Sequence, residues 1–215
     1  MSRRVVYFIL NGIHTNPAQT DGWVDEAATL LNRQTPDNVK PEKFEYYTTA
    51  LTRRLFQARR AEKLLHKALG YAEDGWTVRM IGHSNGCDLI ARVALAAAKK
   101  EIPTLRLDSV HLIAPAAEDA DFAQAVQCGA ISRVHIYGSA NDKALLAAGL
   151  SAKLLNFVGL GFGSLGLRGK ALADRFPGRV FDHSRDHYGH STWIGGLALP
   201  GTVREILEHD EILIP

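Results

Sequence analysis

The sequence predicts an α/β fold: a three-layer sandwich in which helices cover both faces of a mostly parallel, six-stranded sheet. Two observations lead to this prediction. Short runs of β-branched and aromatic residues alternate with longer amphipathic stretches along the chain. Each short run is almost continuously apolar, as expected of a strand buried on both faces. The 215 residues suffice for one well-packed domain and are few for two, so we expect a single domain over residues 1–215.

The expected strands are the runs rich in valine, isoleucine and aromatic residues, at Val5–Leu10, Phe44–Thr49, Thr77–Ile81, Ser109–Ala114, Val134–Tyr137 and Arg179–Phe181. Apolar residues at helical spacing predict helices at about Trp23–Arg33, Arg53–Tyr71, Asn85–Lys100, Asp121–Gln127, Lys143–Phe157 and Thr202–His209. The second of these helices carries a cluster of basic residues opposite its apolar face, which we interpret as a solvated surface.

One segment, residues 154–169, departs from this alternation. It is rich in glycine, which disfavours a helix, and also in large apolar residues such as Phe162. Two interpretations stay open: an irregular loop packed against the core, or a mobile apolar flap that contacts an acyl chain or a lipid surface. We discount a phosphate-binding loop because no Gly-Lys-Ser/Thr follows the glycines.

Composition narrows the classes of function. The formal net charge of +2 is too small to favour nucleic acid as a partner. The two cysteines, Cys87 and Cys128, form neither a disulfide framework nor a metal-ligand spacing. No stretch is long enough for a transmembrane segment, and the apolar N-terminal run lacks the cleavage site of a signal peptide. We therefore expect a cytoplasmic protein without a bound metal.

Residues 82–86, Gly-His-Ser-Asn-Gly, carry the most informative motif. They read G-x-S-x-G and stand between a buried-strand pattern and a helical pattern. That context is typical of a nucleophile elbow, a strained turn whose two glycines avoid collisions with the neighbouring strand and helix. Ser84 is therefore the candidate nucleophile. The similar Gly-His-Ser at 189–191 has Trp193 in place of the second glycine.

A nucleophilic serine needs a general base, and the base needs an acid that orients it. In a parallel sheet such residues gather beyond the carboxyl ends of the strands. Asp142, after the fifth strand, is the preferred acid, and capping the next helix is its alternative role. His190, in the histidine-rich loop after the last strand, is the preferred base. Other candidates remain, namely His187 and then His183 as base, and Glu118, Asp119, Asp121, Asp182 and Asp186 as acid.

The negative charge that develops on a substrate carbonyl needs two N–H donors, which form an oxyanion hole. The residue after the nucleophile, Asn85, supplies one. The loop after the first strand supplies the other, where Gly12 lets the backbone turn toward the serine, Ile13 is the preferred donor and His14 the next. Three residues are candidate substrate contacts: His14, His83 and Phe162.

The chain order Ser84, Asp142, His190 resembles that of the α/β-hydrolase superfamily, over nearly the whole chain. The sequence is similar to minimal, cap-less members such as small lipases and cutinase-like esterases, without the usual N-terminal hairpin. The resemblance implies acyl transfer through a covalent acyl-serine, with a small-molecule or lipid ester as substrate and no cofactor. Asn11-Gly12 stands where His-Gly is frequent in the superfamily, which leaves the second oxyanion donor open.

Several alternative functions remain, some of which would use the same candidate catalytic residues and some of which would use none of them. A thioesterase, an acyltransferase or a peptidase would carry an identical catalytic set. A binding protein on a hydrolase scaffold would lack a complete triad, and a role in docking to a lipid surface would depend on the apolar segment alone. All candidate triad residues are present, which favours an enzyme.

Overall fold

The computed structural model describes residues 3–12, 22–44, 46, 50–147, 163 and 165–212, with side chains for all of these except 50–55. Six strands form one sheet in the order β2-β1-β3-β4-β5-β6. Their bounds are β1 Val5–Leu10, β2 Val39–Phe44, β3 Thr77–His83, β4 Leu107–Ile113, β5 Ile131–Tyr137 and β6 Val180–Asp182. Every pair of neighbours runs parallel, which confirms the predicted type of sheet.

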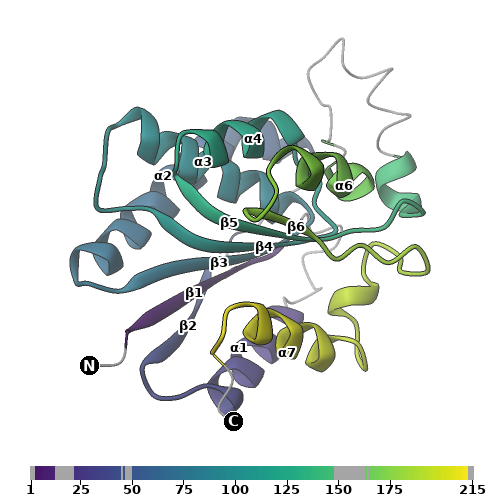
Figure 1. The fold of residues 1–215 in the computed structure, drawn as a ribbon, viewed down its shortest axis with the longest axis horizontal. Helices are drawn as coiled ribbons and strands as arrows, with labels where there is room; N and C mark the ends of the chain where they lie inside the picture. The colour runs from purple at the N-terminus through teal and green to yellow at the C-terminus, as the bar shows by residue number, and fades with distance from the viewer. Residues whose placement is uncertain are drawn as a thin grey trace.

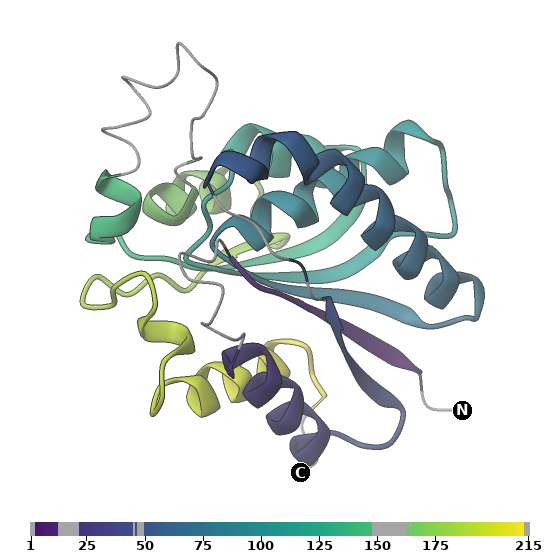
Figure 2. The same cartoon turned by 180° about the vertical axis from the view of Figure 1, so that it is seen from behind.

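Helices cover both faces of this sheet. Their bounds are α1 Gly22–Gln34, α2 Ala50–Glu73, α3 Asn85–Lys99, α4 Asp119–Gln127, α6 Leu165–Arg175 and α7 Leu199–His209, with a short 3-10 helix η2 at Thr192–Ile194. Residues 143–147 are also helical. Helices α2, α3, α4 and α6 lie on one face, and α1 and α7 on the other (Figures 1 and 2). The expected three-layer sandwich is confirmed.

Each face of the sheet packs into its own hydrophobic cluster. Val110 and Leu112 of β4 belong to the cluster under α2, α3, α4 and α6. Ile113 of the same strand belongs to the cluster under α1 and α7, together with Tyr7 and Val203. The central strands are thus apolar on both faces, which explains why their sequences are nearly continuous hydrophobic runs.

The second strand lies earlier in the chain than predicted. It ends at Phe44 instead of starting there, and its register with β1 runs from Val39 opposite Val5 to Phe44 opposite Leu10. The aromatic run after Phe44 has the higher intrinsic strand propensity, but pairing with β1 selects the more polar stretch before it. Pro41 is tolerated in this strand because β2 lies at the edge of the sheet.

The predicted loop over residues 154–169 is wrong for its last five residues, which begin α6, a helix that the sequence did not predict. The helix is kinked at Arg168, whose φ is −131°. Gly166 lies inside it because of close packing: a Cβ there would be 2.5 Å from Leu145 Cδ1 and 3.0 Å from the Pro115 carbonyl oxygen. Residues 148–162 and 164 lie outside the described residues, and with them most of the expected Lys143–Phe157 helix.

The strand order places a topological switch point where a site is expected. The chain leaves β1 for β2 on one side and returns to β3 on the other, so the connections diverge between β1 and β3. Ligands of open α/β sheets bind at such a switch point, beyond the carboxyl ends of the strands. Both Asn11, after β1, and Ser84, after β3, lie there. No helix in the described ranges is long and apolar enough to cross a membrane.

Candidate active site

Ser84 occupies a sharp turn between β3 and α3. Its φ is +53°, a conformation that residues other than glycine rarely adopt. The turn is tight because both flanking glycines are crowded: a Cβ on Gly82 would lie 2.8 Å from Ile90 Cδ1, and one on Gly86 would lie 2.6 Å from the Asn11 carbonyl oxygen. The main chain of Ser84 is fixed on both sides, since its N–H donates to Ile113 and its carbonyl accepts from Ala116. The local geometry is that of a nucleophile elbow.

The structure brings Asp142 and His190 to this serine. His190 Nδ1 lies 2.8 Å from Asp142 Oδ2, and His190 Nε2 lies 3.0 Å from Ser84 Oγ. An ionised carboxylate only accepts hydrogen bonds, so Nδ1 carries the imidazole proton and Nε2 faces the serine hydroxyl with its lone pair. The three side chains therefore form a continuous chain in which His190 is oriented to take the proton of Ser84.

Burial and hydrogen bonding compete at Asp142, whose side chain is 1% exposed. Burial by itself raises the pKa of this carboxyl group. The hydrogen bond and the charge of His190, with two backbone N–H donors at Ala144 and Leu145, outweigh burial and hold the pKa of Asp142 below its usual value. Asp142 is therefore a carboxylate at neutral pH, as an orienting acid must be.

The expected oxyanion donors are partly within the described residues. Asn85 is the first residue of α3, where backbone N–H groups have no acceptor inside the helix. Gly12 lies against Ser84: a Cβ there would be 2.9 Å from Ser84 Cβ. The loop that was expected to supply the second donor thus starts beside the serine. Ile13, His14 and Phe162 lie outside the described residues.

No protein-family profile matches this sequence, and no curated protein sequence matches it either. Solved structures do match. A Xanthomonas campestris protein assigned to the α/β superfamily of hydrolases aligns with a TM-score of 0.55 over 96% of this chain and 99% of its own, at 17% identity. Est1E from Butyrivibrio proteoclasticus aligns with a TM-score of 0.57 over 97% of this chain and 89% of its own, at 14% identity.

An arylesterase aligns with a TM-score of 0.60, covering 99% of this chain and 78% of its own, at 10% identity. This protein has the α/β-hydrolase fold. At such identities the likeness establishes the fold alone, so the chemistry of this α/β-hydrolase fold has to be argued from its own side chains.

The other candidate bases and acids lie elsewhere in the fold. His183 Nε2 lies 3.1 Å from His135 Nδ1, and the His187 ring packs edge-on against Tyr188. Asp119 and Asp121 lie within the first turn of α4, and Glu118 directly precedes that helix. Asp182 bonds to Ser184. Among the described residues, Asp142 is the only carboxylate hydrogen bonded to the imidazole of His190.

Sequence reasoning missed a hydrogen-bonded group around Asn11. The Asn11 Oδ1 accepts from the N–H of Gly12 at 2.8 Å and from the indole N–H of Trp23 at 2.7 Å, and its carbonyl accepts from the hydroxyl of Tyr46. Asn11 thereby fixes the main chain that enters the expected oxyanion loop. The sequence signal for this group was that Asn11-Gly12 stands where His-Gly is frequent, but that signal does not reveal which residues bond to Asn11.

A cluster of three histidines lies where the end of α7 meets β5 and the residue after β6. His135, His183 and His209 each offer a ring nitrogen, and these atoms lie within 4.8 Å of one another. A metal lies in the plane of each imidazole that ligates it. The three ring planes are inclined by only 6° to 20° to one another, so their lone pairs do not converge on one point. The cluster is a hydrogen-bonded stack, and Arg185 adds positive charge beside it.

A second group that offers metal-ligand atoms is His111, His135 and Asp210. Its carboxylate is already occupied: Asp210 Oδ2 lies 2.6 Å from the Tyr7 hydroxyl, 2.9 Å from His111 Nε2 and 3.3 Å from the Arg79 guanidinium. A cation would have to displace that guanidinium. The group is therefore better described as a buried ion-pair network than as a metal site.

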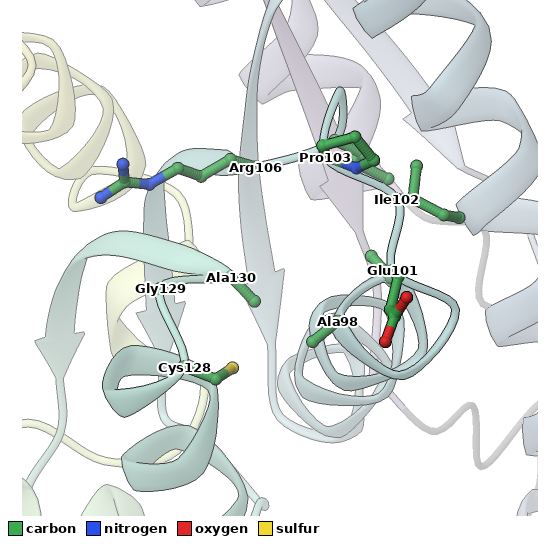
Figure 3. A pocket seen from close by; sticks show the side chains of 10 residues that line it. Ala98, Glu101, Ile102, Pro103, Arg106, Cys128, Gly129 and Ala130 are labelled. Atoms are coloured by element: carbon green, nitrogen blue, oxygen red, sulfur yellow. The ribbon is translucent and has the colours of Figure 1, made fainter.

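Two surface pockets lie away from the triad. One, of about 310 Å³, has Ala98 and Glu101 at the end of α3 on one side and Cys128 and Ala130 before β5 on the other (Figure 3). The second, of about 410 Å³, lies between α2 and α3. The first pocket is at the amino ends of β4 and β5, whereas Ser84 lies at the opposite side of the sheet, beyond the carboxyl ends of the strands. It does not serve the nucleophile.

Proposed function

We propose that the protein is a serine hydrolase that cleaves carboxylic esters through an acyl-serine intermediate. The observation that carries this proposal is the hydrogen-bond chain from Asp142 through His190 to Ser84, at 2.8 and 3.0 Å, with the serine on a turn of positive φ. Residues 1–215 would form one catalytic domain. The names of similar structures, among them an arylesterase and the carboxylesterase EstE1, favour an ester as substrate.

The reaction follows from the geometry. Ser84 Oγ attacks the ester carbonyl carbon while His190 Nε2 takes the hydroxyl proton, and the carbonyl oxygen becomes an oxyanion. His190 then gives the proton to the alkoxide oxygen, which leaves as an alcohol. Asp142 holds the imidazole tautomer through Nδ1–H and stabilises the imidazolium ion. Water, deprotonated by His190, releases the acid and restores Ser84.

Backbone N–H groups would stabilise the oxyanion. Asn85 supplies one, and Ile13, or His14 after it, supplies the other. The loss of one such donor reduces rates by about a hundred- to a thousandfold. The Asn85 N–H lies at the amino end of α3, where the helix dipole also stabilises the negative charge of the oxyanion.

The test is covalent labelling by a fluorophosphonate, read out as intact mass. We expect one adduct on the wild-type protein and none on Ser84→Ala. Ser191→Ala is the matched control, because Ser191 follows the same Gly-His pair, adjoins the catalytic base and makes no side-chain cap. It should be labelled like the wild type. An unlabelled wild-type protein would contradict the proposal and favour a binding protein on this scaffold.

The leaving group is tested with matched substrates of one acyl chain presented as ester, thioester and amide. We expect the ester to be cleaved with the highest kcat/KM. Faster cleavage of the thioester or amide would assign a thioesterase or a peptidase to the same triad. Transfer of the acyl group to an added alcohol in preference to water would assign an acyltransferase.

A further inference from the structure

His83 and Ser84 are neighbours at the end of β3, and both contact the base. Ser84 Oγ lies 3.0 Å from His190 Nε2, and His83 Nε2 lies 3.0 Å from the main-chain carbonyl oxygen of His190. We infer that His83 is a positioning residue that fixes the main chain of the base relative to the strand carrying the nucleophile. This inference rests on the proposed function.

The hydrogen bond defines the state of His83. A carbonyl oxygen only accepts, so Nε2 of His83 carries the proton, and Nδ1, which has no hydrogen-bond partner within the described part of the chain, does not. The side chain is buried, with His83 6% exposed. Burial, and next the charge of His190, lower the pKa of His83 to about 3. His83 is therefore a neutral donor and adds no positive charge beside the imidazolium that forms in catalysis.

The base needs such an anchor because of where it lies. Residues 183–191, which include His190, contain no strand or helix. The start of this loop is bonded to the end of β5, where His183 N–H donates to the Ile136 carbonyl and Arg185 N–H to the Gly138 carbonyl. Beside His190, by contrast, the backbone N–H bonds are local ones, between Gly189 and Thr192. The contact with His83 joins positions 107 residues apart and connects this loop directly to the sheet. A displacement of about 1 Å in a catalytic group lowers rates by about a hundredfold, so the position of the loop matters.

His83 is itself held rigidly. The ring of Trp23 packs against it edge-on, with centroids 5.9 Å apart, and Trp23 is fixed in turn by its bond to Asn11. Gly12 closes the other side, since a Cβ there would lie 3.3 Å from His83 Nδ1. Because the ring cannot move, its hydrogen bond holds the loop at a fixed position relative to β3. Its own ring lies 5.0 Å from that of His190 and makes no bond to the reacting nitrogen.

Three variants test the donor. In His83→Gln the side-chain amide nitrogen reaches about as far as Nε2, whereas in His83→Asn it stops one atom short, and His83→Phe has a ring but no donor. We expect kcat to fall by about ten- to a hundredfold in His83→Phe and His83→Asn with KM nearly unchanged, and His83→Gln to recover most of it. His66→Phe, on the exposed face of α2, is the matched control and should keep the wild-type kcat.

Three kinetic results would overturn the inference. One is a wild-type kcat in His83→Phe. Another is a His83→Gln variant as slow as His83→Phe, which would mean that ring packing and not the donor matters. The third is a change in KM alone, which would make His83 a substrate contact instead.

A measurement independent of turnover separates this inference from the proposed function. The Nδ1 proton of His190, bound to Asp142, should give a resolved low-field proton resonance. We expect it to broaden or vanish in His83→Phe and to persist in His83→Gln. If the wild-type protein neither cleaves esters nor reacts with a fluorophosphonate, the proposed function fails. The resonance then still tests the positioning role of His83. Its loss in His83→Phe but not in His83→Gln supports that role, and an unchanged resonance in His83→Phe refutes it.

Discussion

At the scale of single residues, Asp142 makes both sets of contacts that sequence reasoning treats as alternatives, to the candidate base and to the start of the next helix. Its Oδ2 accepts from His190, and its Oδ1 accepts from the N–H groups of Ala144 and Leu145, at 3.0 and 3.1 Å. A carboxylate has two oxygens and enough lone pairs for both tasks. The cap fixes the rotation of the carboxylate, and that rotation aims Oδ2 at the imidazole.

The two roles of Asp142 are separable by substitution. Asp142→Asn keeps an oxygen for the cap but offers N–H to His190, so the imidazole takes the wrong tautomer; we expect kcat to fall by about 10⁴-fold with little loss of stability. Asp142→Ala should lose kcat similarly and also about 1 kcal/mol of stability from the missing cap. Ester kinetics and urea unfolding measure the two effects. Equal stability of the two variants would contradict the capping role.

The histidine loop offers a second comparison among residues. His190→Gln should lower kcat by several orders of magnitude, because among the described residues His190 is the one imidazole within hydrogen-bond distance of Ser84. His187→Gln should keep the wild-type kcat, since its ring packs on Tyr188. His183→Gln should affect stability through its lost bond to His135 and leave kcat intact. Ester kinetics on the three variants would refute the assignment if His187→Gln were the slowest.

At the scale of elements, the end of β5 and the start of α6 meet by backbone contact. The N–H of Ser139 donates to the Gly166 carbonyl at 3.0 Å, and the N–H of Gly166 donates to Pro115 at 3.0 Å. A Cβ on Gly138 would lie 2.4 Å from the Gly166 oxygen. Gly138 and Gly166 therefore allow the start of α6 to contact the main chain at the ends of β4 and β5. Gly138 begins the loop that carries Asp142.

Because of this close contact, adding a methyl group at Gly138 should lower the stability of the protein, whereas the same change at an exposed glycine within a helix should raise it. Gly138→Ala should destabilise the protein by about 1–3 kcal/mol, because the clash is with backbone that is bonded on both sides. Gly70→Ala should stabilise it by about 0.5–1 kcal/mol, since Gly70 is exposed within α2 and has nothing within 4 Å of the added Cβ. Thermal unfolding compares the two, and a neutral Gly138→Ala would show that α6 shifts freely.

At the scale of the whole molecule, one buried network fastens α7 to the sheet. Asp210, at the end of α7, is fully buried and accepts hydrogen bonds from Tyr7, Ser109 and His111, which lie on β1 and β4. Arg79 of β3, also buried, lies 3.3 Å from the same carboxylate oxygen. Burial raises the pKa of Asp210, but these partners outweigh it and leave the pKa well below its usual value.

Removal of this carboxylate should unfold the C-terminal part of the sandwich first. In Asp210→Ala the guanidinium of Arg79 stays buried next to Tyr7 with one carboxylate partner, Asp108, instead of two. We expect a loss of about 3–5 kcal/mol, as for other broken buried ion pairs. Urea unfolding measures it, and hydrogen exchange should show α7 losing protection. Arg204→Ala, on an exposed pair of the same helix, is the control and should cost less than about 1 kcal/mol.

The histidine stack makes stability depend on pH. Burial, and then neighbouring charges, lower the pKa of His135 to about 2 and that of His183 to about 4. The unfolded values are about 6.5, so below that pH the unfolded chain binds more protons and the free energy of unfolding falls as pH falls. A buried histidine such as His135 contributes a slope of about 1.4 kcal/mol per pH unit between about pH 6.5 and its folded pKa.

Urea unfolding between pH 8 and pH 4.5 measures this slope. Stability should be nearly constant above about pH 6.5 and fall below it, and His135→Phe should fall less steeply than the wild type. Asp210 adds its own loss only below about pH 4, where its unfolded form takes up a proton. Identical slopes in the wild type and His135→Phe would show that His135 accepts a proton while folded.

Sequence patterns were sufficient for features that depend on neighbouring residues. Five of the six strands lie within three residues of their predicted bounds, since buried parallel strands are continuous apolar runs, whereas the second shares only Phe44 with its predicted range. The sharp turn at Ser84 could be predicted because the two glycines that it requires lie two positions before and after it in the sequence. The order of Ser84, Asp142 and His190 also follows from where strands end, and the structure brings these three side chains together.

Tertiary contact alone decided the rest. Pairing with β1 moved the second strand to Val39–Phe44 against local propensity, and packing on Leu145 placed Gly166 in a helix. No local pattern joins His83 to a carbonyl 107 residues away, or Asp210 to Arg79. The sequence by itself determined where most of the strands lie and which residues are candidates for the chemistry, because those signals span only a few neighbouring positions. The folded chain determined which of them touch, because contact between distant residues depends on the whole path of the backbone.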